Sequence, residues 1–169
     1  MAARKPSRTQ LKAIKLLLLD VDGVMTDGGV YFSEKGDELK KFNILDGYGI
    51  VKLQRQGIRA GIITGRVSQV VARRAHELGI SEVYQNLENK LEVYEQIKTK
   101  LGLQDSAIGY IGDDEPDVPV MKKAGFSACP ANAVDAVRRN ADYVCKRRGG
   151  EGAVREVIDL VLGSRTDGR

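Results

Sequence analysis

Short aliphatic runs alternate along the chain with longer segments in which apolar residues recur at helical spacing. Apolar side chains on both faces predict four buried strands, over residues 14–19, 60–63, 107–111 and 126–128. Helical spacing predicts helices over residues 47–56, 67–78, 88–101, 116–123, 131–139 and 150–162. Strands that alternate with helices in this way predict a parallel sheet covered on both faces, which is a three-layer α/β fold.

Residues 29–43 break this alternation. They contain two short β-prone stretches around a turn at residues 33–37, which predicts a β-hairpin directly after the first strand. An isolated hairpin is only marginally stable in water and needs a surface to pack against. We therefore expect a flap that either covers the carboxyl edge of the sheet or pairs with another subunit.

The length of 169 residues fits one domain, and no linker or low-complexity tract divides it. We expect the folded domain to span residues 13–163. The basic N-terminal residues 1–12 and the C-terminal residues 164–169 are expected to be disordered.

The distribution of charge argues against a nucleic-acid partner. The formal net charge is +4, but residues 1–15 alone carry five basic side chains and no acidic one. Positive charge thus gathers at the ends of the chain, without interleaved aromatic residues that would stack on bases. A solubilising periphery is the favoured interpretation.

Cysteine and histidine usage excludes further kinds of site. His76, Cys129 and Cys145 are too few and too scattered for a Cys/His zinc cluster. Two separated cysteines and no apolar leader predict a cytoplasmic protein in a reducing compartment. The longest aliphatic run, residues 16–19, is far too short to span a membrane, so no membrane association is expected.

Polar residues follow the predicted strands at their carboxyl ends, where ligands of open α/β sheets bind. In chain order they are Asp20, Asp22, Thr64, Asp113, Asp114 and Asp117, and to them we add Lys90, which opens a predicted helix after Asn89. Several carboxylates in one crevice disfavour one another's ionisation, so they require a cation. Ligation by oxygen alone, without His or Cys, indicates Mg²⁺.

A purely structural interpretation exists for each of these residues. Asp22 with Gly23 could form a turn, and Asp113 with Asp114 could cap the helix after Pro116. Turn and cap chemistry does not predict a lysine at position 90 or the order of the whole set. The functional interpretation is therefore favoured for the set taken together.

The order of these residues resembles that of the haloacid dehalogenase (HAD) superfamily of phosphohydrolases. The motifs that carry the resemblance are Asp20-Val21-Asp22-Gly23-Val24, Ile63-Thr64-Gly65-Arg66, Lys90 and Gly112-Asp113-Asp114-Glu115-Pro116-Asp117. One such motif is weak evidence, whereas four in this order at strand ends are specific. The resemblance implies a Rossmann-like HAD fold and Mg²⁺-dependent hydrolysis of a phosphomonoester.

The resemblance also implies a role for each residue. Asp20 would be the nucleophile that forms an aspartyl-phosphate, and Asp22 would protonate the leaving alcohol and then deprotonate the attacking water. Asp20, Asp113 and the backbone carbonyl of Asp22 would hold Mg²⁺. Thr64 and Lys90 would bind the oxygens of the transferring phosphoryl group.

Two further aspartates would support this set from behind. Asp117 would orient Lys90 rather than bind the metal, and Asp114 is a weaker candidate for the same outer layer.

Too few residues lie between the motifs for a cap domain, and within the superfamily the chain looks most like the tetrameric 3-deoxy-D-manno-octulosonate 8-phosphate phosphatases of lipopolysaccharide precursor synthesis. The matching stretches are residues 20–28, 42–49, 63–66 and 149–156. The resemblance implies a homotetramer assembled through the hairpins, in which a neighbour helps to close each site. It also implies that the Gly-rich segment 147–152 reaches an adjacent site.

The same resemblance implies a set of substrate-binding residues. They are Asp22, Gly23, Asn43, Asp46, Gly47, Thr64, Gly65, Arg66, Arg74 and Lys90. The octulosonate enzymes commonly carry arginine at the positions of Leu45 and Val51, so the chain departs from the pattern there. Phosphatases of nine-carbon keto-acid 9-phosphates (the KDN or N-acylneuraminate type) lack those arginines too, but tend to carry Glu in place of Arg66. Arg66 favours the octulosonate, since arginine binds carboxylates well.

Functions of other classes remain as alternatives. A phospho-accepting receiver module shares the acidic pocket, the threonine and the lysine, but it has no use for a second carboxylate at Asp22 or for a flap. A non-catalytic tetrameric scaffold would not need the complete set of candidate residues. The time for which phosphate stays bound would separate a receiver from a phosphatase.

Overall fold

The computed structural model describes residues 6–166 and contains a six-stranded parallel sheet. The strand order is β5-β4-β1-β6-β7-β8. The strands are β1 (Leu16–Leu19), β4 (Arg59–Ile63), β5 (Glu82–Tyr84), β6 (Ile108–Ile111), β7 (Phe126–Cys129) and β8 (Tyr143–Val144). In register, Leu19 at the end of β1 lies between Ile62 of β4 and Ile111 of β6. The central strands therefore end at one common edge.

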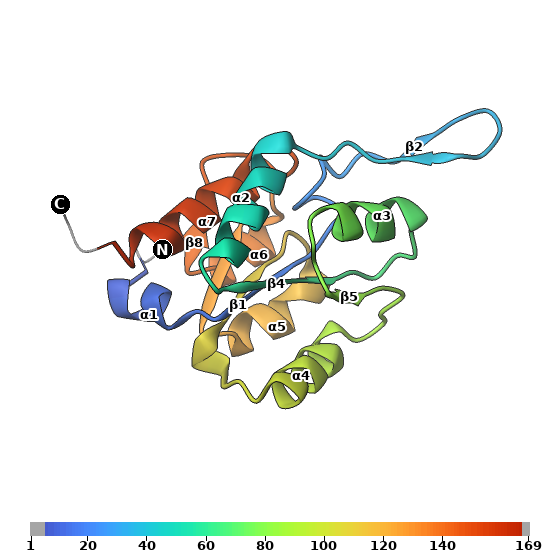
Figure 1. The fold of residues 1–169 in the computed structure, drawn as a ribbon. Helices are drawn as coiled ribbons and strands as arrows, with labels where there is room; N and C mark the ends of the chain where they lie inside the picture. The colour runs from blue at the N-terminus through green and yellow to red at the C-terminus, as the bar shows by residue number, and fades with distance from the viewer. Residues whose placement is uncertain (1–5, 167–169) are drawn as a thin grey trace.

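Helices cover both faces of this sheet, as Figure 1 shows. One face carries α1 (Arg8–Ala13), α2 (Ile44–Arg55), α3 (Gln69–Glu77) and α7 (Ala153–Gly163), and the other carries α4 (Lys90–Leu101), α5 (Val118–Lys123) and α6 (Asp135–Asn140). Short 3₁₀ turns, η1 (Asp105–Ala107) and η2 (Glu115–Asp117), flank β6. The three-layer α/β prediction is confirmed.

Strand β1 shows why its leucine run is buried on both sides. Leu17 and Leu19 belong to the hydrophobic core under α2 and α7, whereas Leu16 and Leu18 belong to the core under α4 and α5. Successive side chains of a strand point to opposite faces, so an all-apolar strand suits a sheet covered twice.

Two strands escaped prediction because they are short and lie at the edges of the sheet. β5 has three residues and begins with Glu82, and β8 has two. Neither forms the run of four or more apolar residues that marks a buried strand.

The prediction of disorder over residues 1–12 and 164–169 is wrong for the parts of these termini that the structure describes. Residues 8–13 form α1, whose Leu11 is buried in the core, and Arg8 Nε donates to the Ser164 carbonyl at 2.9 Å. Ser7 caps α1 by accepting from Gln10 N. Burial of the apolar Leu11 and this contact between the chain ends stabilise the helix despite its basic composition. Residues 1–5 and 167–169, which fall under the same expectation, lie outside the described residues.

The predicted hairpin is present as β2 (Tyr31–Phe32) and β3 (Glu38–Leu39), paired antiparallel. It extends away from the sheet past α3 (Figure 1). Tyr31, Phe32 and Leu39 are exposed on it. The segment between β1 and α2 therefore holds a flap and no second domain.

Within residues 6–166, none of the helices has the length and apolarity needed to cross a bilayer.

Candidate active site

A cavity of about 260 Å³ lies at the carboxyl edge of the sheet. It is lined by Asp20, Asp22, Thr64, Gly65, Arg66, Leu87, Glu88, Lys90, Asp113, Asp114, Pro116 and Asp117. β1, β4 and β6 are parallel neighbours, so the residues after each strand meet at this edge. The structure thus brings together the whole set of candidate residues that was identified at the strand ends.

The turn after β1 presents Asp20 and Asp22 to the cavity. Asp20 N still donates to the Ile111 carbonyl at 2.9 Å, which continues the β1–β6 ladder by one residue. The chain then turns at Gly23, whose φ is 88°. A β-carbon at Gly23 would overlap the carboxylate of Asp113, so only glycine allows the two loops to approach this closely. Gly23 therefore shapes the cavity without lining it.

Asp20, Asp113 and Asp117 form a compact group of carboxylates. One oxygen from each lies within 4.8 Å of the others. Burial, and then the charge of Asp117, raises the pKa of Asp20; burial, and then the charge of Asp20, raises the pKa of Asp113. Among the described residues, Asp113 Oδ1 is a buried oxygen with no hydrogen-bond partner. A buried, acceptor-only set of this kind fits a hard divalent cation such as Mg²⁺.

Asp117 differs from the other two because its oxygens are already occupied. Oδ1 accepts from Lys90 Nζ at 2.7 Å and from Tyr110 Oη at 2.6 Å, and Oδ2 accepts from Asp113 N at 2.9 Å and from Asp114 N at 3.2 Å. Its side chain is fully buried. Asp117 therefore fixes the loop and the lysine, which leaves Asp20 and Asp113 as the carboxylates able to hold the metal.

Lys90 is the first residue of α4 and points into the cavity. Asn89 starts the helix by accepting from Leu91 N and Glu92 N. Lys90 Nζ lies 3.1 Å from Asp20 and 2.7 Å from Asp117. Burial works against the charge, but the two carboxylates outweigh it and raise the pKa of Lys90. A permanent cation thus stands beside the proposed nucleophile.

Thr64 and Arg66 enter the cavity from the loop after β4. Thr64 is buried, and its backbone N–H donates to the Tyr84 carbonyl at 3.0 Å. Arg66 is about half exposed and reaches Glu38 of the hairpin at 3.1 Å. The threonine is placed to face a phosphate, whereas the arginine lies further out.

Five predicted substrate residues do not line the cavity: Gly23, described above, Gly47, and the three residues Asn43, Asp46 and Arg74. Asn43 caps α2, accepting from Leu45 N at 2.8 Å. Asp46 accepts from Arg155 N at 2.8 Å, at the beginning of α7. Arg74 packs over the Phe42 ring, 5.8 Å from its centroid.

Gly47 explains why Arg74 can approach α2. A β-carbon at Gly47 would clash with the guanidinium of Arg74. Substrate contacts for these five residues stay a prediction.

The Gly-rich segment 147–152 lies against the active-site loop of its own chain. Gly150 N donates to the Val24 carbonyl at 3.1 Å, and Gly149 N donates to Asn132 Oδ1 at 2.9 Å. A β-carbon at Gly149 would overlap the carbonyl oxygen of Gly23. The segment thus supports the Asp20–Gly23 turn from behind, and its reach to a neighbouring site stays a prediction.

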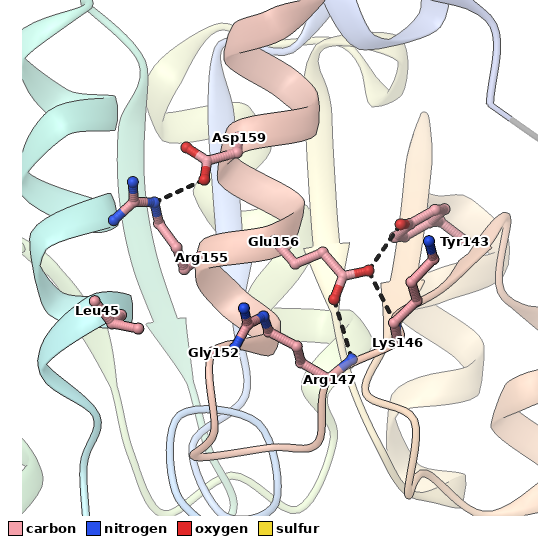
Figure 2. Close-up of a pocket in the computed structure, with 8 residues that line it drawn as sticks. All are labelled: Leu45, Tyr143, Lys146, Arg147, Gly152, Arg155, Glu156 and Asp159. Atoms are coloured by element: carbon pink, nitrogen blue, oxygen red, sulfur yellow. Dashed lines mark hydrogen bonds and ion pairs between the residues drawn. The ribbon is translucent and has the colours of Figure 1, made fainter.

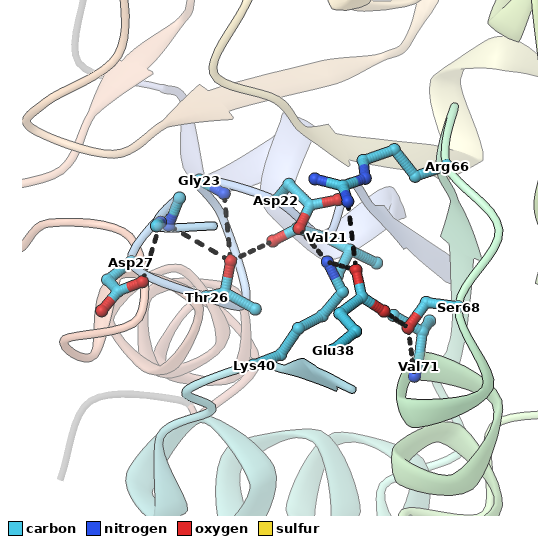
Figure 3. A network of polar contacts seen from close by, with 12 residues as sticks. Val21, Asp22, Gly23, Thr26, Asp27, Glu38, Lys40, Arg66, Ser68 and Val71 are labelled. Carbon is cyan, nitrogen blue, oxygen red and sulfur yellow. Dashed lines mark hydrogen bonds and ion pairs between the residues drawn. The ribbon is translucent and has the colours of Figure 1, made fainter. Parts of the chain in front are cut away.

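Sequence reasoning missed the side chains at the base of the hairpin. Lys40 Nζ lies 2.5 Å from Asp22 Oδ1, and Glu38 bonds to Arg66 and to Ser68 (Figure 3). Alternation along an extended strand was the available signal, since Glu38 and Lys40 share one face while Leu39 takes the other. The hairpin is therefore in contact with the cavity.

A larger cavity of about 680 Å³ lies beside α7 and shares no lining residue with the first one (Figure 2). Two of its acidic side chains already have partners: Asp159 pairs with Arg155 at 2.8 Å, and Glu156 accepts from Tyr143 Oη and from two backbone N–H groups. Nothing in this arrangement resembles a group of reactive side chains.

Comparisons with known proteins agree with this geometry. The family model for haloacid dehalogenase-like hydrolases matches residues 76–158. The 3-deoxy-D-manno-octulosonate 8-phosphate phosphatase KdsC of Escherichia coli is 46% identical over 149 residues, which cover 88% of this chain and 79% of that protein. The Yersinia pestis protein of the same name is also 46% identical over 149 residues, with 88% of this chain and 80% of that protein covered.

Solved structures give the same picture. The Yersinia pestis phosphatase superimposes with a TM-score of 0.92 at 44% identity, covering 94% of this chain and 85% of the other. The Moraxella catarrhalis phosphatase, solved with a magnesium ion, a phosphate ion and a KDO molecule, gives 0.91 at 42% identity, covering 93% and 90%. The chain therefore belongs to the 3-deoxy-D-manno-octulosonate 8-phosphate phosphatase family of haloacid dehalogenase-like hydrolases.

Proposed function

We propose that the chain is a Mg²⁺-dependent phosphoric monoester hydrolase that removes the phosphate of 3-deoxy-D-manno-octulosonate 8-phosphate, a step of lipopolysaccharide precursor synthesis. The observation that carries the proposal is the meeting of Asp20, Asp22, Thr64, Lys90 and Asp113 around one small cavity. Relatives that are 46% identical and bear the name of this activity support the choice of substrate.

The first step is the transfer of the phosphoryl group to the protein. An Asp20 carboxylate oxygen attacks phosphorus, and the bond between phosphorus and the sugar oxygen breaks. Asp22, in its protonated form, gives its proton to the departing sugar oxygen. Lys90 and Thr64 bind the phosphoryl oxygens, where negative charge must be stabilised. Asp20, Asp113 and the Asp22 carbonyl would hold a magnesium ion, which would supply charge neutralisation and orientation of the phosphate.

The second step returns Asp20 to its free form. Asp22, now a carboxylate, takes a proton from water while the water oxygen attacks phosphorus. The Asp20–phosphorus bond breaks, and inorganic phosphate leaves. Asp22 ends the cycle protonated, so the two steps balance.

Phosphate release from keto-acid sugar phosphates, measured with Mg²⁺ and with EDTA, tests this proposal. We expect phosphate release from the octulosonate 8-phosphate in the presence of Mg²⁺ and none in the presence of EDTA. After acid quenching and digestion, we expect labelled phosphate on Asp20. Faster release from a nine-carbon 9-phosphate would instead assign the substrate to the KDN or N-acylneuraminate type, as the absence of arginine at Leu45 and Val51 allows. Label on any other residue would contradict the mechanism.

We also propose that the chain forms a homotetramer through its hairpins. Exposed apolar side chains cluster on the hairpin and on the first turns of α2; they are Val30, Tyr31, Phe32, Leu39, Ile44, Leu45 and Tyr48. Apolar surface of this extent on one side of a protein is typical of an interface. Symmetric copies of one chain are the commonest partners for such a surface.

A cytoplasmic location accords with the cysteines. Cys129 and Cys145 are free thiols, both buried. A reducing compartment preserves thiols in this state.

A further inference from the structure

The side chain of Lys40 is buried although the hairpin that carries it is largely exposed. Its side chain is 3% exposed, whereas that of the neighbouring Lys41 is 61% exposed. Lysine is rarely buried unless its ammonium group is paired. The burial of Lys40 therefore points to a specific electrostatic partner inside the protein.

That partner is Asp22, and the contact is part of a longer ionic chain. Lys40 Nζ lies 2.5 Å from Asp22 Oδ1 and 3.3 Å from Glu38 Oε1. Glu38 in turn lies 3.1 Å from Arg66 Nη2 and accepts from Ser68 Oγ at 2.6 Å. Figure 3 shows the alternating charges running from the turn after β1, through the hairpin, to the start of α3.

The chain of charges fixes both the hairpin and the carboxylate of Asp22. Glu38 and Lys40 lie on the face of the extended segment that meets the protein, so their two ionic contacts seat the hairpin at its base. The hydrogen bonds that Glu38 accepts, first from Ser68 and then from Lys40, hold its pKa below the usual range. The seat is therefore an ionic one, formed by groups that are charged at neutral pH.

The contact with Lys40 also makes the two carboxylate oxygens of Asp22 different, because Lys40 Nζ binds only one of them. Lys40 takes Oδ1, so Oδ2 is the oxygen left to hold or receive a proton. An acid–base group works only when the correct atom faces the reacting oxygen within hydrogen-bond distance. A donor that fixes the rotation of the carboxylate therefore acts on the proton transfer without touching the substrate.

We propose that Lys40 is a positioning residue for Asp22, which couples the seating of the hairpin to the alignment of the acid–base carboxylate. The inference rests on the proposed phosphatase activity, in which Asp22 protonates the leaving oxygen. Lys40 itself neither forms nor breaks a bond. Its effect must therefore appear where Asp22 gives or takes a proton, and the transfer of phosphate to Asp20 is the step in which that need depends on the leaving group.

Leaving groups of different basicity test this inference. A sugar alcohol leaves as a poor group and needs the proton from Asp22, whereas p-nitrophenolate leaves without one. For Lys40→Met we expect kcat with the octulosonate 8-phosphate to fall about 10- to 100-fold, within the range of general acid catalysis. The burst of p-nitrophenolate in the first turnover of p-nitrophenyl phosphate, which reports only the transfer of phosphate to Asp20, should change less than about threefold. Lys40→Arg, which keeps the charge and a donor, should recover part of the loss.

Two controls sharpen the comparison. Lys41→Met alters the adjacent, exposed lysine and should leave the reaction rates with both substrates unchanged. Asp22→Asn removes the acid itself, so adding Lys40→Met to it should bring no further loss with the sugar phosphate, because the two residues act on the same step. Lys40→Gln is of similar length, has no charge, and answers the question if Lys40→Met does not fold.

The possible outcomes separate the inference from the proposed function. Equal losses in the first turnover of both substrates, or no loss with either, would show that Lys40 does not position Asp22. A fully additive loss in the double variant would overturn the inference as well. Absence of phosphate release by the unaltered protein would instead contradict the proposed function.

Discussion

Three carboxylates and one ammonium group meet at the centre of the site, and the ammonium group of Lys90 contacts two of the carboxylates, Asp20 and Asp117. Asp20, Asp113 and Asp117, when ionised, carry three negative charges against the single positive charge of Lys90. Two negative charges remain in a buried place, and one divalent cation neutralises them. Because of this charge balance, we expect the carboxylates of Asp20 and Asp113 to lower the stability of the fold when metal is absent and to raise it when metal is bound.

Replacement of the proposed nucleophile should abolish turnover and leave the fold intact. Asp20→Asn keeps the size of the side chain but removes the carboxylate that forms the aspartyl-phosphate. We expect phosphate release to fall by roughly three orders of magnitude or more, as for other nucleophile replacements. Circular dichroism should be unchanged, which is the control for folding. Release at a rate near that of the unaltered protein would exclude Asp20 as nucleophile.

Replacement of Asp113 should separate stability from metal binding. Without metal, burial and the charge of Asp20 disfavour the ionised form of Asp113, a cost that an asparagine does not bear, so for Asp113→Asn the melting temperature should rise by about 2–4 °C for each kcal/mol gained. With Mg²⁺, the unaltered protein should gain stability through binding, and the variant should gain little. Thermal melts in EDTA and in saturating Mg²⁺ measure both effects, with Asp114→Asn as the neighbouring control. An equal response of Asp113→Asn and unaltered protein to Mg²⁺ would remove Asp113 from the metal site.

At the scale of elements, Asp46 links α2 to α7. The N-cap residue of α7 is Gly152, which has no side chain to accept from the first turn, and Asp46 of α2 accepts from Arg155 N instead. The close packing of the two helices buries this carboxylate: a β-carbon at Gly49 would lie 2.9 Å from Arg155 Cδ. Burial raises the pKa of Asp46 to about 6. The contact between α2 and α7 therefore includes a carboxylate that changes its protonation near pH 6.

Asp46 should give the stability a measurable pH dependence. Its pKa is higher in the folded chain than the 3.8 of an exposed aspartate, so the folded state binds more protons between about pH 4 and pH 6. The contribution of Asp46 to stability is thus full below pH 4 and is lost as pH rises to about 6. The loss is on the order of 3 kcal/mol. Asp46→Asn, which can still accept from Arg155 N, should remove this part of the slope.

Denaturant unfolding at several pH values between 4 and 7 measures the difference between the two proteins. Asp159→Asn, at the exposed partner of Arg155, is the control and should keep the slope. Parallel curves for the unaltered protein and Asp46→Asn would show that the buried carboxylate does not carry the pH dependence.

Elements with a regular pattern could be predicted from the sequence, and those held by contacts between distant segments could not. The four apolar strands and the aspartates that follow them depend on local sequence and on the rule that parallel strands end at one edge. Helix α1 depends instead on Arg8 reaching Ser164, and the burial of Lys40 depends on where the hairpin folds back. The contact of Arg8 leaves no local signal in the chain, and the alternation around Leu39 indicates only that Glu38 and Lys40 share a face, not which partner that face meets.

At the scale of the whole molecule, the hairpin is the part whose apolar side chains remain exposed to solvent in a single chain. Phe32 is 62% exposed and Leu39 59%, on a ribbon whose strands have two residues each. Two-stranded ribbons of this kind are unstable alone, and the ionic seat at Glu38 and Lys40 fixes only the base. Contact with other copies of the chain would cover the apolar side chains and order the tip.

Replacement of these side chains should therefore dissociate the assembly without unfolding the chain. If the proposed tetramer forms, we expect light scattering after size exclusion to give the unaltered protein the mass of four chains of 18.5 kDa, and to show a smaller species for Tyr31→Ser combined with Phe32→Ser. Both side chains lie outside the hydrophobic core, so the circular dichroism should be kept. Val134→Ser, an exposed valine at the start of α6, is the control and should stay assembled.

Activity should follow the assembly if a neighbour completes each site. Asn43, Asp46 and Arg74 do not line the cavity of their own chain, so recognition of the sugar away from its phosphate needs further groups. Dissociation should then raise KM for the octulosonate 8-phosphate at least about tenfold, a loss of roughly 1.4 kcal/mol in binding. Turnover of p-nitrophenyl phosphate, which has no sugar to recognise, should change little. A monomeric variant with an unchanged KM for the sugar phosphate would show that each chain binds its substrate alone.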